Sequence, residues 1–249
     1  MQNTSVALVT GANAGIGRQV AKELAGHGYT VLVGSRDLGR GEAAAAGMDG
    51  DAHAVQLDVT DEASIAAAAQ RIRNEFGRLD VLVNNAGISF VGDADTPLEE
   101  RARQGLLTEV SPDVARQFFE TNVIGPIALT QALLPLLREA PAARIVNVGS
   151  SGSSLTLNAD ENNPQRSMFG IYPTSKSALH AATLGFATAL EPAGIKVNVA
   201  DPGFTATALN NFQGTKTVEE GARHIVRMAL IGPDGPTGTF SGDDGPLPW

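Results

Sequence analysis

The chain of 249 residues contains no cysteine and only four histidines. The absence of cysteine excludes disulfide bonds and thiolate metal ligands. The histidines show no close ligand spacing; they are His27, His53, His180 and His224. We therefore expect no metal site.

Basic residues are also scarce, because 18 lysines and arginines stand against 27 acidic residues and give a net charge of −9. This balance disfavours nucleic acid or an anionic membrane as the main partner, although it allows a local basic pocket. The chain has no apolar run of ~18 residues, and a strand pattern begins within a few residues of Met1, leaving no room for a signal peptide. We expect a cytoplasmic protein with a small-molecule substrate, either a monomer or a homo-oligomer.

What the sequence does contain is a regular alternation of short β-branched runs and longer Ala/Leu-rich helical patterns. With 43% hydrophobic residues and no internal linker, residues 1–249 are expected to form one α/β domain with a doubly wound, Rossmann-type parallel sheet. The predicted strands are 6–10, 30–34, 53–57, 79–84, 144–148, 195–200 and 238–240. The predicted helices are 15–27, 37–47, 61–76, 112–138, 172–191 and 217–230.

Three stretches fit this alternation poorly, namely 88–110, 152–171 and 204–216. Each follows the carboxyl end of a predicted strand, where sheets of this kind bind ligands. We therefore expect these stretches to form the substrate loops.

A glycine-rich turn, Thr10-Gly11-Ala12-Asn13-Ala14-Gly15-Ile16-Gly17, joins the first predicted strand to the first predicted helix. Glycines let the backbone approach a pyrophosphate, and the helix N-terminus offers it free N–H groups. The turn therefore predicts a dinucleotide site. The residues expected to contact the cofactor here are Gly11, Asn13, Gly15, Ile16, Gly17 and Arg18.

The end of the second predicted strand favours NADPH over NADH. An NAD site expects an acidic residue there, whereas this chain has Ser35 followed by Arg36. The Arg36 guanidinium can pair with a 2′-phosphate, with Arg18 and Arg40 nearby. The alternatives are that Arg36 and Arg40 are ordinary surface charges, or that Asp37 partly neutralises Arg36.

Tyr172 and Lys176 stand four residues apart. If the run is helical, the two side chains lie on one face, and the ammonium group can lower the pKa of the tyrosine from its ordinary ~10. Such a tyrosine suits proton transfer. Taken alone, the spacing also fits a solvated surface pair.

Four short motifs occur in order: Gly11-x-x-x-Gly15-x-Gly17, Asn84-Asn85-Ala86-Gly87, Tyr172-x-x-x-Lys176 and Asp201-Pro202-Gly203. Over nearly its whole length the chain resembles the classical short-chain dehydrogenase/reductase family. The run 235–240 and the final Pro248-Trp249 resemble its carbonyl-reductase-like branch. The chain departs from the compact family pattern in the 22-residue step from Ser150 to Tyr172 and in an extra segment around 93–110.

The resemblance implies a catalytic set of Asn122, Ser150, Tyr172 and Lys176. Ser150 would hydrogen-bond the substrate carbonyl, and Ser151 is its rival. Asn122 would hold a water that relays protons, and Lys176 would also bind the nicotinamide ribose.

The resemblance also implies cofactor contacts beyond the glycine turn. They are Asp58 and Val59 at the adenine, Asn85, Ala86 and Gly87 along the adenosine ribose, and Pro202, Gly203, Thr205 and Thr207 at the nicotinamide, in addition to Tyr172 and Lys176. Asn84 is expected instead to tie adjacent strands together.

These expectations combine into NADPH-dependent reduction of a ketone or aldehyde, with Tyr172 as general acid. Apolar residues on or beside the three loops suggest a hydrophobic or aromatic substrate; they are Phe90, Met168, Phe169, Phe204, Leu209, Phe212 and Trp249. The alternatives are an alcohol, steroid or polyol dehydrogenase working in the oxidative direction, and a nucleotide-sensing protein without turnover.

Two further expectations concern loops and tail. Residues 204–216 should form a mobile lid. The C-terminal tail, with two prolines and the only tryptophan, should be docked rather than frayed.

Overall fold

The computed structural model describes residues 4–92 and 96–249, and within them one eight-stranded sheet has the order β3-β2-β1-β4-β5-β6-β7-β8. The first seven strands are parallel, and β8 pairs antiparallel with β7. The strands are β1 (Val6–Val9), β2 (Thr30–Ser35), β3 (Ala52–Gln56), β4 (Val81–Asn84), β5 (Arg144–Val148), β6 (Lys196–Ala200), β7 (Phe240–Gly242) and β8 (Gly245–Pro246).

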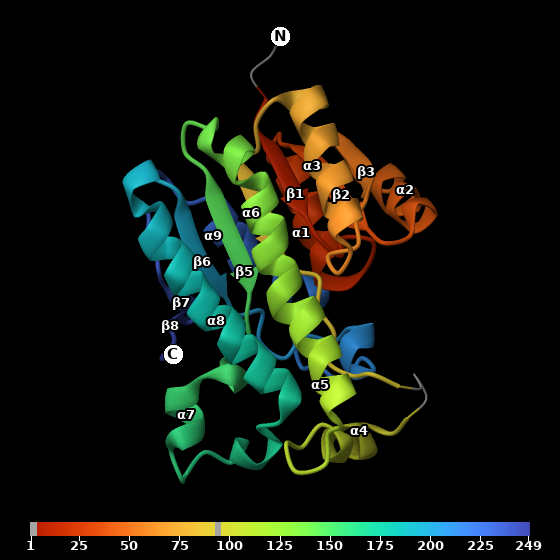
Figure 1. Cartoon of the computed structure of the whole chain (residues 1–249), viewed down its shortest axis with the longest axis vertical. Coiled ribbons are helices and arrows are strands. Elements are labelled where there is room, and N and C mark those ends of the chain that lie inside the picture. Colours follow the sequence, from red (N-terminus) through yellow and green to blue (C-terminus); the bar gives the residue numbers. More distant parts are fainter. Residues whose placement is uncertain (1–3, 93–95) are drawn as a thin grey trace.

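Helices cover both faces of the sheet (Figure 1). Because successive strand residues point to opposite faces, Leu8 packs in one apolar core and its neighbours Ala7 and Val9 in another. The first core is covered by α3 (Glu62–Phe76), α6 (Gly125–Arg138) and α8 (Ile171–Leu190). The second is covered by α1 (Gly15–Gly26), α2 (Leu38–Ala46) and α9 (Val218–Ala229).

The doubly wound α/β fold is thus confirmed, and the predicted strands are found within about two residues of their expected ends. The predicted helix 112–138 is present as three consecutive pieces: α5 (Pro112–Phe119), a π-helical turn (Glu120–Ile124) and α6. The sequence did not predict the short helices α4 (Leu98–Gln104) and α7 (Leu155–Ala159), nor strand β8. Within the described chain, no helix has both the length and the apolar character needed to cross a membrane.

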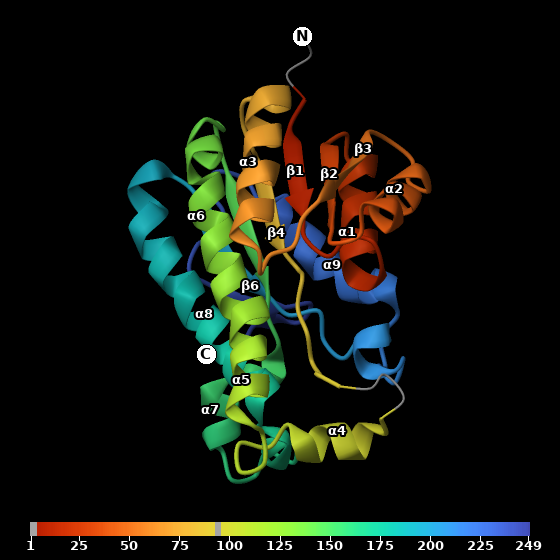
Figure 2. The same cartoon turned by 45° about the vertical axis from the view of Figure 1, so that its right-hand side comes forward.

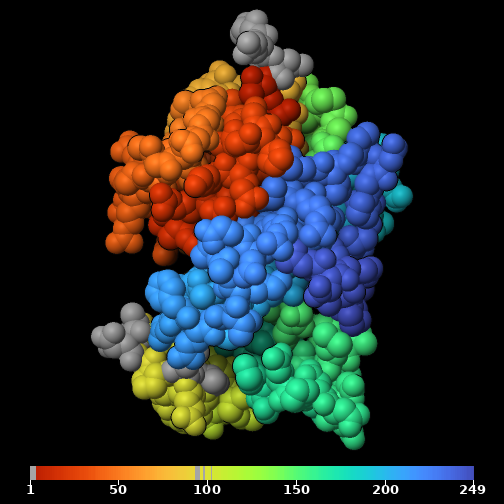
Figure 3. Space-filling view, turned by 180° about the vertical axis from the view of Figure 1, so that it is seen from behind, coloured from red at the N-terminus to blue at the C-terminus, as the bar shows by residue number. Residues whose placement is uncertain are grey.

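The three expected substrate loops gather at the carboxyl end of the sheet, at the lower end of Figures 1 and 2. Ser89 Oγ donates to the carbonyl of Leu209 at 2.7 Å, which joins the first loop to the third. The backbone N–H of Ile171 donates to the carbonyl of Gly105 at 2.8 Å, which joins the second to the first. Figure 3 shows the first loop and residues 204–216 adjacent on the surface. Residues 93–95 of the first loop lie outside the described residues.

Candidate active site

Helix α8 carries Tyr172 and Lys176 in its first two turns. Its start is fixed by Gly170, where a Cβ would lie 2.4 Å from the carbonyl oxygen of Gly105. A side chain at position 170 would therefore push α8 away from the first loop. The expected helical placement of the tyrosine and lysine on one face is present.

Lys176 is buried, with 4% of its surface exposed, and its Nζ donates to the carbonyl of Val148 at 2.9 Å. Burial lowers the pKa of Lys176 to about 8. Gly87 lies beside this ammonium group, because a Cβ there would be 3.5 Å from Nζ. The chain after β4 is thus brought to the lysine.

The prediction that Lys176 lowers the pKa of Tyr172 is wrong for this structure. Burial and, to a smaller extent, the carboxylate of Asp201 together raise the pKa of Tyr172 to about 12. The Lys176 ammonium group is engaged by Val148. Tyr172 therefore keeps its proton at neutral pH.

Asn122 is fully buried in the π-helical turn. Its amide donates to the carbonyl of Ile88 at 2.9 Å and accepts from the Ile88 N–H at 2.9 Å. Its Nδ2 also donates to Ser175 Oγ at 3.0 Å, and that hydroxyl donates to the carbonyl of Tyr172 at 2.7 Å. Asn122 thus connects the chain after β4 to the first turn of α8.

The same helix approaches the end of β3 very closely at Gly125. A Cβ on Gly125 would lie 2.6 Å from the carbonyl oxygen of Val59. The π-helical turn, which ends immediately before Gly125, adds one residue to the helix. The Asn122 side chain in this turn faces Ile88. The sequence predicted Asn122 in a helix but gave no signal for the π turn.

Ser150 follows the end of β5 with an extended backbone, φ −159° and ψ 129°. Ser151 begins a short 3₁₀ turn, Ser151–Ser153. Ser150 therefore continues the strand direction, whereas Ser151 turns away from it. The backbone N–H of Ser150 donates to Nε2 of His180 at 3.4 Å, a contact that sequence reasoning missed. The i, i+8 spacing of His180 from Tyr172 on one helix was the available signal.

The glycine turn has the geometry of a phosphate cradle. Gly11 and Gly15 have φ of 62° and 55°, in the left-handed region that glycine adopts without strain. A Cβ on Gly17 would lie 2.3 Å from Asn85 Nδ2, so the start of α1 packs tightly on the chain after β4. No side chain caps the N-terminus of α1 at Ala14, which leaves its first N–H groups available to an anion.

Several residues predicted to contact the cofactor direct their side chains into the protein instead. Asn85 Nδ2 donates to the carbonyl of Thr10 at 2.8 Å. Ile16 and Val59 pack against the apolar cores. Thr205 is buried with its hydroxyl donating to the carbonyl of Pro202 at 3.1 Å. The side chains of Val59 and Thr205 are buried, so their backbones are the parts available to a cofactor.

The remaining predicted cofactor residues lie in the glycine turn or in the chain that follows β3, β4 or β6. The side chain of Thr207 lies beside Gly15, since a Cβ on Gly15 would be 3.5 Å from Thr207 Cγ2. Asp58 accepts from the backbone N–H of Thr60 at 2.9 Å and from its hydroxyl at 2.7 Å.

Gly203 has a φ of 69°, and its N–H donates to Asp201 at 3.1 Å. Asn13 is half-buried in the turn, Ala86 N–H donates to Thr10 Oγ1 and Pro202 is half-buried.

The expected role of Asn84 as a tie between strands is confirmed. Its Nδ2 donates to Asn147 Oδ1 at 2.8 Å, from β4 to β5, and also reaches Thr130 Oγ1 of α6 at 3.3 Å.

At the end of β2, Ser35 is buried and donates to the carbonyl of Asp37 at 2.7 Å. Asp37 Oδ1 accepts from the N–H of Arg40 at 2.9 Å and so caps α2. Within residues 4–92 and 96–249, the guanidinium groups of Arg18, Arg36 and Arg40 are exposed and have no carboxylate partner. Asp37 therefore does not neutralise Arg36.

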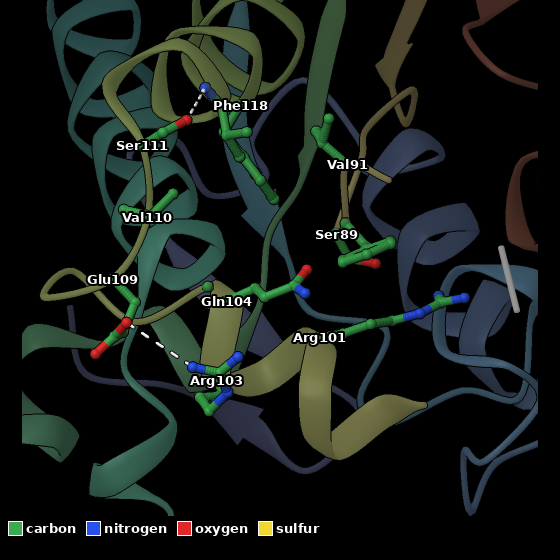
Figure 4. Close-up of a pocket in the computed structure, with 12 residues that line it drawn as sticks. Ser89, Val91, Arg101, Arg103, Gln104, Glu109, Val110, Ser111 and Phe118 are labelled. Atoms are coloured by element: carbon green, nitrogen blue, oxygen red, sulfur yellow. Dashed lines mark hydrogen bonds and ion pairs between the residues drawn. The ribbon is translucent and has the colours of Figure 1, made fainter. Parts of the chain in front are cut away.

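A cavity of about 310 Å³ lies between the first loop and α5 (Figure 4). Phe90, Phe118 and three valines form its apolar wall, and the amide of Gln104 points into it. Gly105 also lines it and contacts Gly170 just before the start of α8. Of the seven apolar residues named from the sequence, this cavity includes Phe90.

The other six apolar residues divide into an exposed group and a half-buried pair, Phe169 and Trp249. Met168, Phe204, Leu209 and Phe212 are exposed by 65%, 56%, 44% and 70%, on the rims of the second and third loops. Trp249 is half-buried and packs on other aromatic rings, so the prediction of a docked tail is confirmed.

Comparisons with known proteins place this site in a family. Residues 5–217 match the family model for short chain dehydrogenases. The chain is 32% identical to salutaridine reductase from Papaver somniferum, over 94% of this chain and 93% of that protein. It is likewise 32% identical to (−)-isopiperitenone reductase from Mentha piperita, over 94% and 95% of the two chains.

Solved structures of reductases superpose on this chain over most of its length. The structure of salutaridine reductase from Papaver somniferum superposes with a TM-score of 0.80 at 31% identity, covering 95% of this chain and 99% of that one. A 3-ketoacyl-(acyl-carrier-protein) reductase from Brucella melitensis complexed with NADH gives a TM-score of 0.79 at 26% identity, covering 96% of each chain. The chain therefore belongs to the short-chain dehydrogenase/reductase family of oxidoreductases.

Proposed function

We propose that the protein reduces a ketone or aldehyde to an alcohol with NADPH. The observation that carries this proposal is the network around the start of α8, in which Asn122 is bonded through Ser175 to the carbonyl of Tyr172, Lys176 is bonded to the end of β5, and Asn122 and Lys176 both lie beside Gly87. The reductases named among the relatives support the direction of the reaction.

The residues around the glycine turn fit a phosphorylated dinucleotide. The positive φ of Gly11 and Gly15 and the uncapped start of α1 suit a pyrophosphate. The three guanidinium groups that have no carboxylate partner among the described residues suit the 2′-phosphate that distinguishes NADPH from NADH, and Ser35 brings no opposing charge. When bound, NADPH supplies the hydride. One structural relative was solved with NADH, and it is the arginines of this chain that favour NADPH.

Tyr172 is the proton donor in this proposal. Its raised pKa of about 12 keeps the hydroxyl protonated at neutral pH, as a general acid requires. Ser150 Oγ would hydrogen-bond the substrate oxygen, and this bond strengthens as negative charge develops there. Protonated Lys176 would bind the nicotinamide ribose, the other role that the family resemblance implies for it.

Asn122 would act on Lys176 indirectly, through the water that the family resemblance assigns to it. Both side chains lie against Gly87, because a Cβ there would be 3.2 Å from Asn122 Oδ1 and 3.5 Å from Lys176 Nζ. Asn122 also fixes the first turn of α8 through Ser175. It therefore positions Tyr172 and Lys176 relative to each other.

The substrate is proposed to be hydrophobic. The cavity wall formed by Phe90 and Phe118 would receive its apolar portion, and the exposed Phe204 and Leu209 would cover it. The amide of Gln104 offers one hydrogen-bonding group to the distal end of such a substrate.

The test is a panel of aliphatic, aromatic and bicyclic ketones and aldehydes, offered with NADPH or NADH. We expect NADPH consumption with the larger apolar ketones and one enantiomer of the alcohol as product. Oxidation of alcohols without any ketone reduction would instead indicate a dehydrogenase. NADPH binding without turnover of either kind would indicate a nucleotide-sensing protein.

A further inference from the structure

His180 stands one turn beyond Lys176 and two turns beyond Tyr172 on α8, so the three side chains form one stripe of the helix. Its ring is buried, with 3% of the residue exposed. Nε2 accepts a hydrogen bond from the backbone N–H of Ser150 at 3.4 Å, which requires the ring proton to be on Nδ1.

Gly149, the residue before Ser150, lies so close to this ring that no side chain fits there. A Cβ on Gly149 would lie 2.6 Å from His180 Nε2 and 2.2 Å from Val199 Cγ1. Only glycine lets the ring of His180 reach the backbone where β5 ends. The contact is therefore built into two separate elements, β5 and α8.

Two aromatic residues from the C-terminal region hold the ring. The ring centroids of His180 and Phe240 are 4.4 Å apart, and those of His180 and Trp249 are 6.0 Å apart in an edge-on arrangement. Phe240 and Trp249 also contact each other, at 5.7 Å. Edge-on and tilted geometries of this kind are the favoured ones for aromatic pairs.

Trp249 contacts the serine loop as well as the ring. Its carbonyl oxygen accepts from the N–H of Thr156 at 2.8 Å and from Ser154 Oγ at 3.2 Å. The tail thus joins the chain that follows Ser150 to the ring that holds Ser150.

The ring is uncharged near neutral pH. Burial, together with the charge of Lys176, lowers the pKa of His180 to about 4. A neutral ring keeps the lone pair on Nε2 that the Ser150 N–H needs, so His180 is not a proton donor to the substrate.

We propose that His180 is a positioning residue that fixes the backbone of Ser150, and that Phe240 and Trp249 keep its ring in place. This inference rests on the proposed function, in which Ser150 Oγ hydrogen-bonds the substrate carbonyl. Without the acceptor, the Ser150 peptide loses its anchor and the hydroxyl is less well aligned. Turnover should then fall while cofactor binding stays unchanged.

The experiment compares His180→Leu, which removes the acceptor, with His180→Gln, whose side-chain oxygen restores one. We expect His180→Leu to lower kcat about tenfold and His180→Gln to recover most of that loss. NADPH affinity should be unchanged in both variants. A purely structural role would lower the melting temperature of both and would not separate their kcat values.

A double-mutant cycle with Ser150→Ala isolates the link. If His180 acts through Ser150, His180→Leu should change kcat by less than about twofold in the Ser150→Ala background. An equal loss in both backgrounds, or wild-type kcat in His180→Leu alone, would overturn the inference. Full activity of Ser150→Ala itself would instead overturn the role of Ser150 in the proposed function, and the inference with it.

A second variant covers the case in which His180→Leu does not fold. Trp249→Leu removes the edge-on contact but keeps the backbone carbonyl, and we expect kcat to fall about threefold, again only when Ser150 is present. The matched control is Tyr29→Leu, a half-buried aromatic at the opposite end of the sheet. It should lower stability without changing kcat; equal kcat in the Trp249 and Tyr29 variants would contradict the proposal.

Discussion

The two halves of the proposed site hold their polar groups in different ways. On the β1–β3 side, Arg18, Arg36 and Arg40 are exposed and have no carboxylate partner within the described residues. On the β5–α8 side, Asn122, Lys176 and His180 are buried and hydrogen-bonded. The first half is suited to recognise charge that arrives with a ligand, whereas the second holds its groups in place before a ligand arrives. Substitutions in the two halves should therefore have separable effects.

The largest effect is expected from Tyr172→Phe. This change removes the proton donor without opening a cavity, so kcat should fall at least ~10²-fold while NADPH affinity stays within a factor of a few. Steady-state kinetics and a cofactor titration on the same sample measure both quantities. Activity within a few-fold of wild type would remove Tyr172 from the mechanism.

The next effect is the pH dependence of turnover. The pKa of Lys176 is lowered to about 8 by burial, so its charged fraction decreases as the pH rises above that value. The pKa of Tyr172 is about 12, so its proton is retained over the same range. We expect kcat for reduction to fall about tenfold per pH unit above pH 8. A flat profile up to pH 10 would show that the lysine charge is not required.

A smaller effect is expected on cofactor choice. Arg36→Leu should weaken NADPH about tenfold, since one charge-assisted hydrogen bond is lost, and leave NADH unchanged. Ser35→Asp should move preference further towards NADH, because a carboxylate would face the 2′-phosphate. Arg116→Leu on α5 is the control and should leave the ratio of kcat/KM values unchanged. An unchanged ratio in both test variants would place the phosphate elsewhere.

The smallest effect concerns the proposed lid. Backbone pairing of Thr205 with Lys216 joins the two ends of segment 204–216, and Thr207 and Asn210 form a capping box inside it. We expect the segment to move as a unit, and its amide exchange to slow when NADPH and a ketone are both added. Identical exchange with and without ligands would indicate a fixed wall.

Much of the fold could be predicted because local signals agreed with the final structure. The β-branched strands, the glycine turn and the Ala/Leu helices each specify their own element, and parallel α/β topology then orders them. The placement of Tyr172 and Lys176 on one helix face also followed from their spacing.

The features that could not be predicted depend on contacts between residues far apart in the sequence. The π-helical turn exists where Asn122 bonds to Ile88, 34 residues away. The raised pKa of Tyr172 depends on burial, which a helical spacing does not reveal. The contact of His180 with Ser150 requires the absence of a side chain at Gly149. No local pattern in the sequence contains this information.

The central claim is that the buried half of the site delivers a proton from Tyr172 to a carbonyl oxygen as hydride arrives from NADPH. The most direct test uses NADPH with deuterium at both positions of nicotinamide C4 and a hydrophobic ketone, and analyses the product by mass spectrometry. The account predicts an alcohol with one deuterium on the carbinol carbon from the wild-type protein, and at least ~10²-fold slower formation of it by Tyr172→Phe. An alcohol without deuterium, or equal rates in the two proteins, would contradict it.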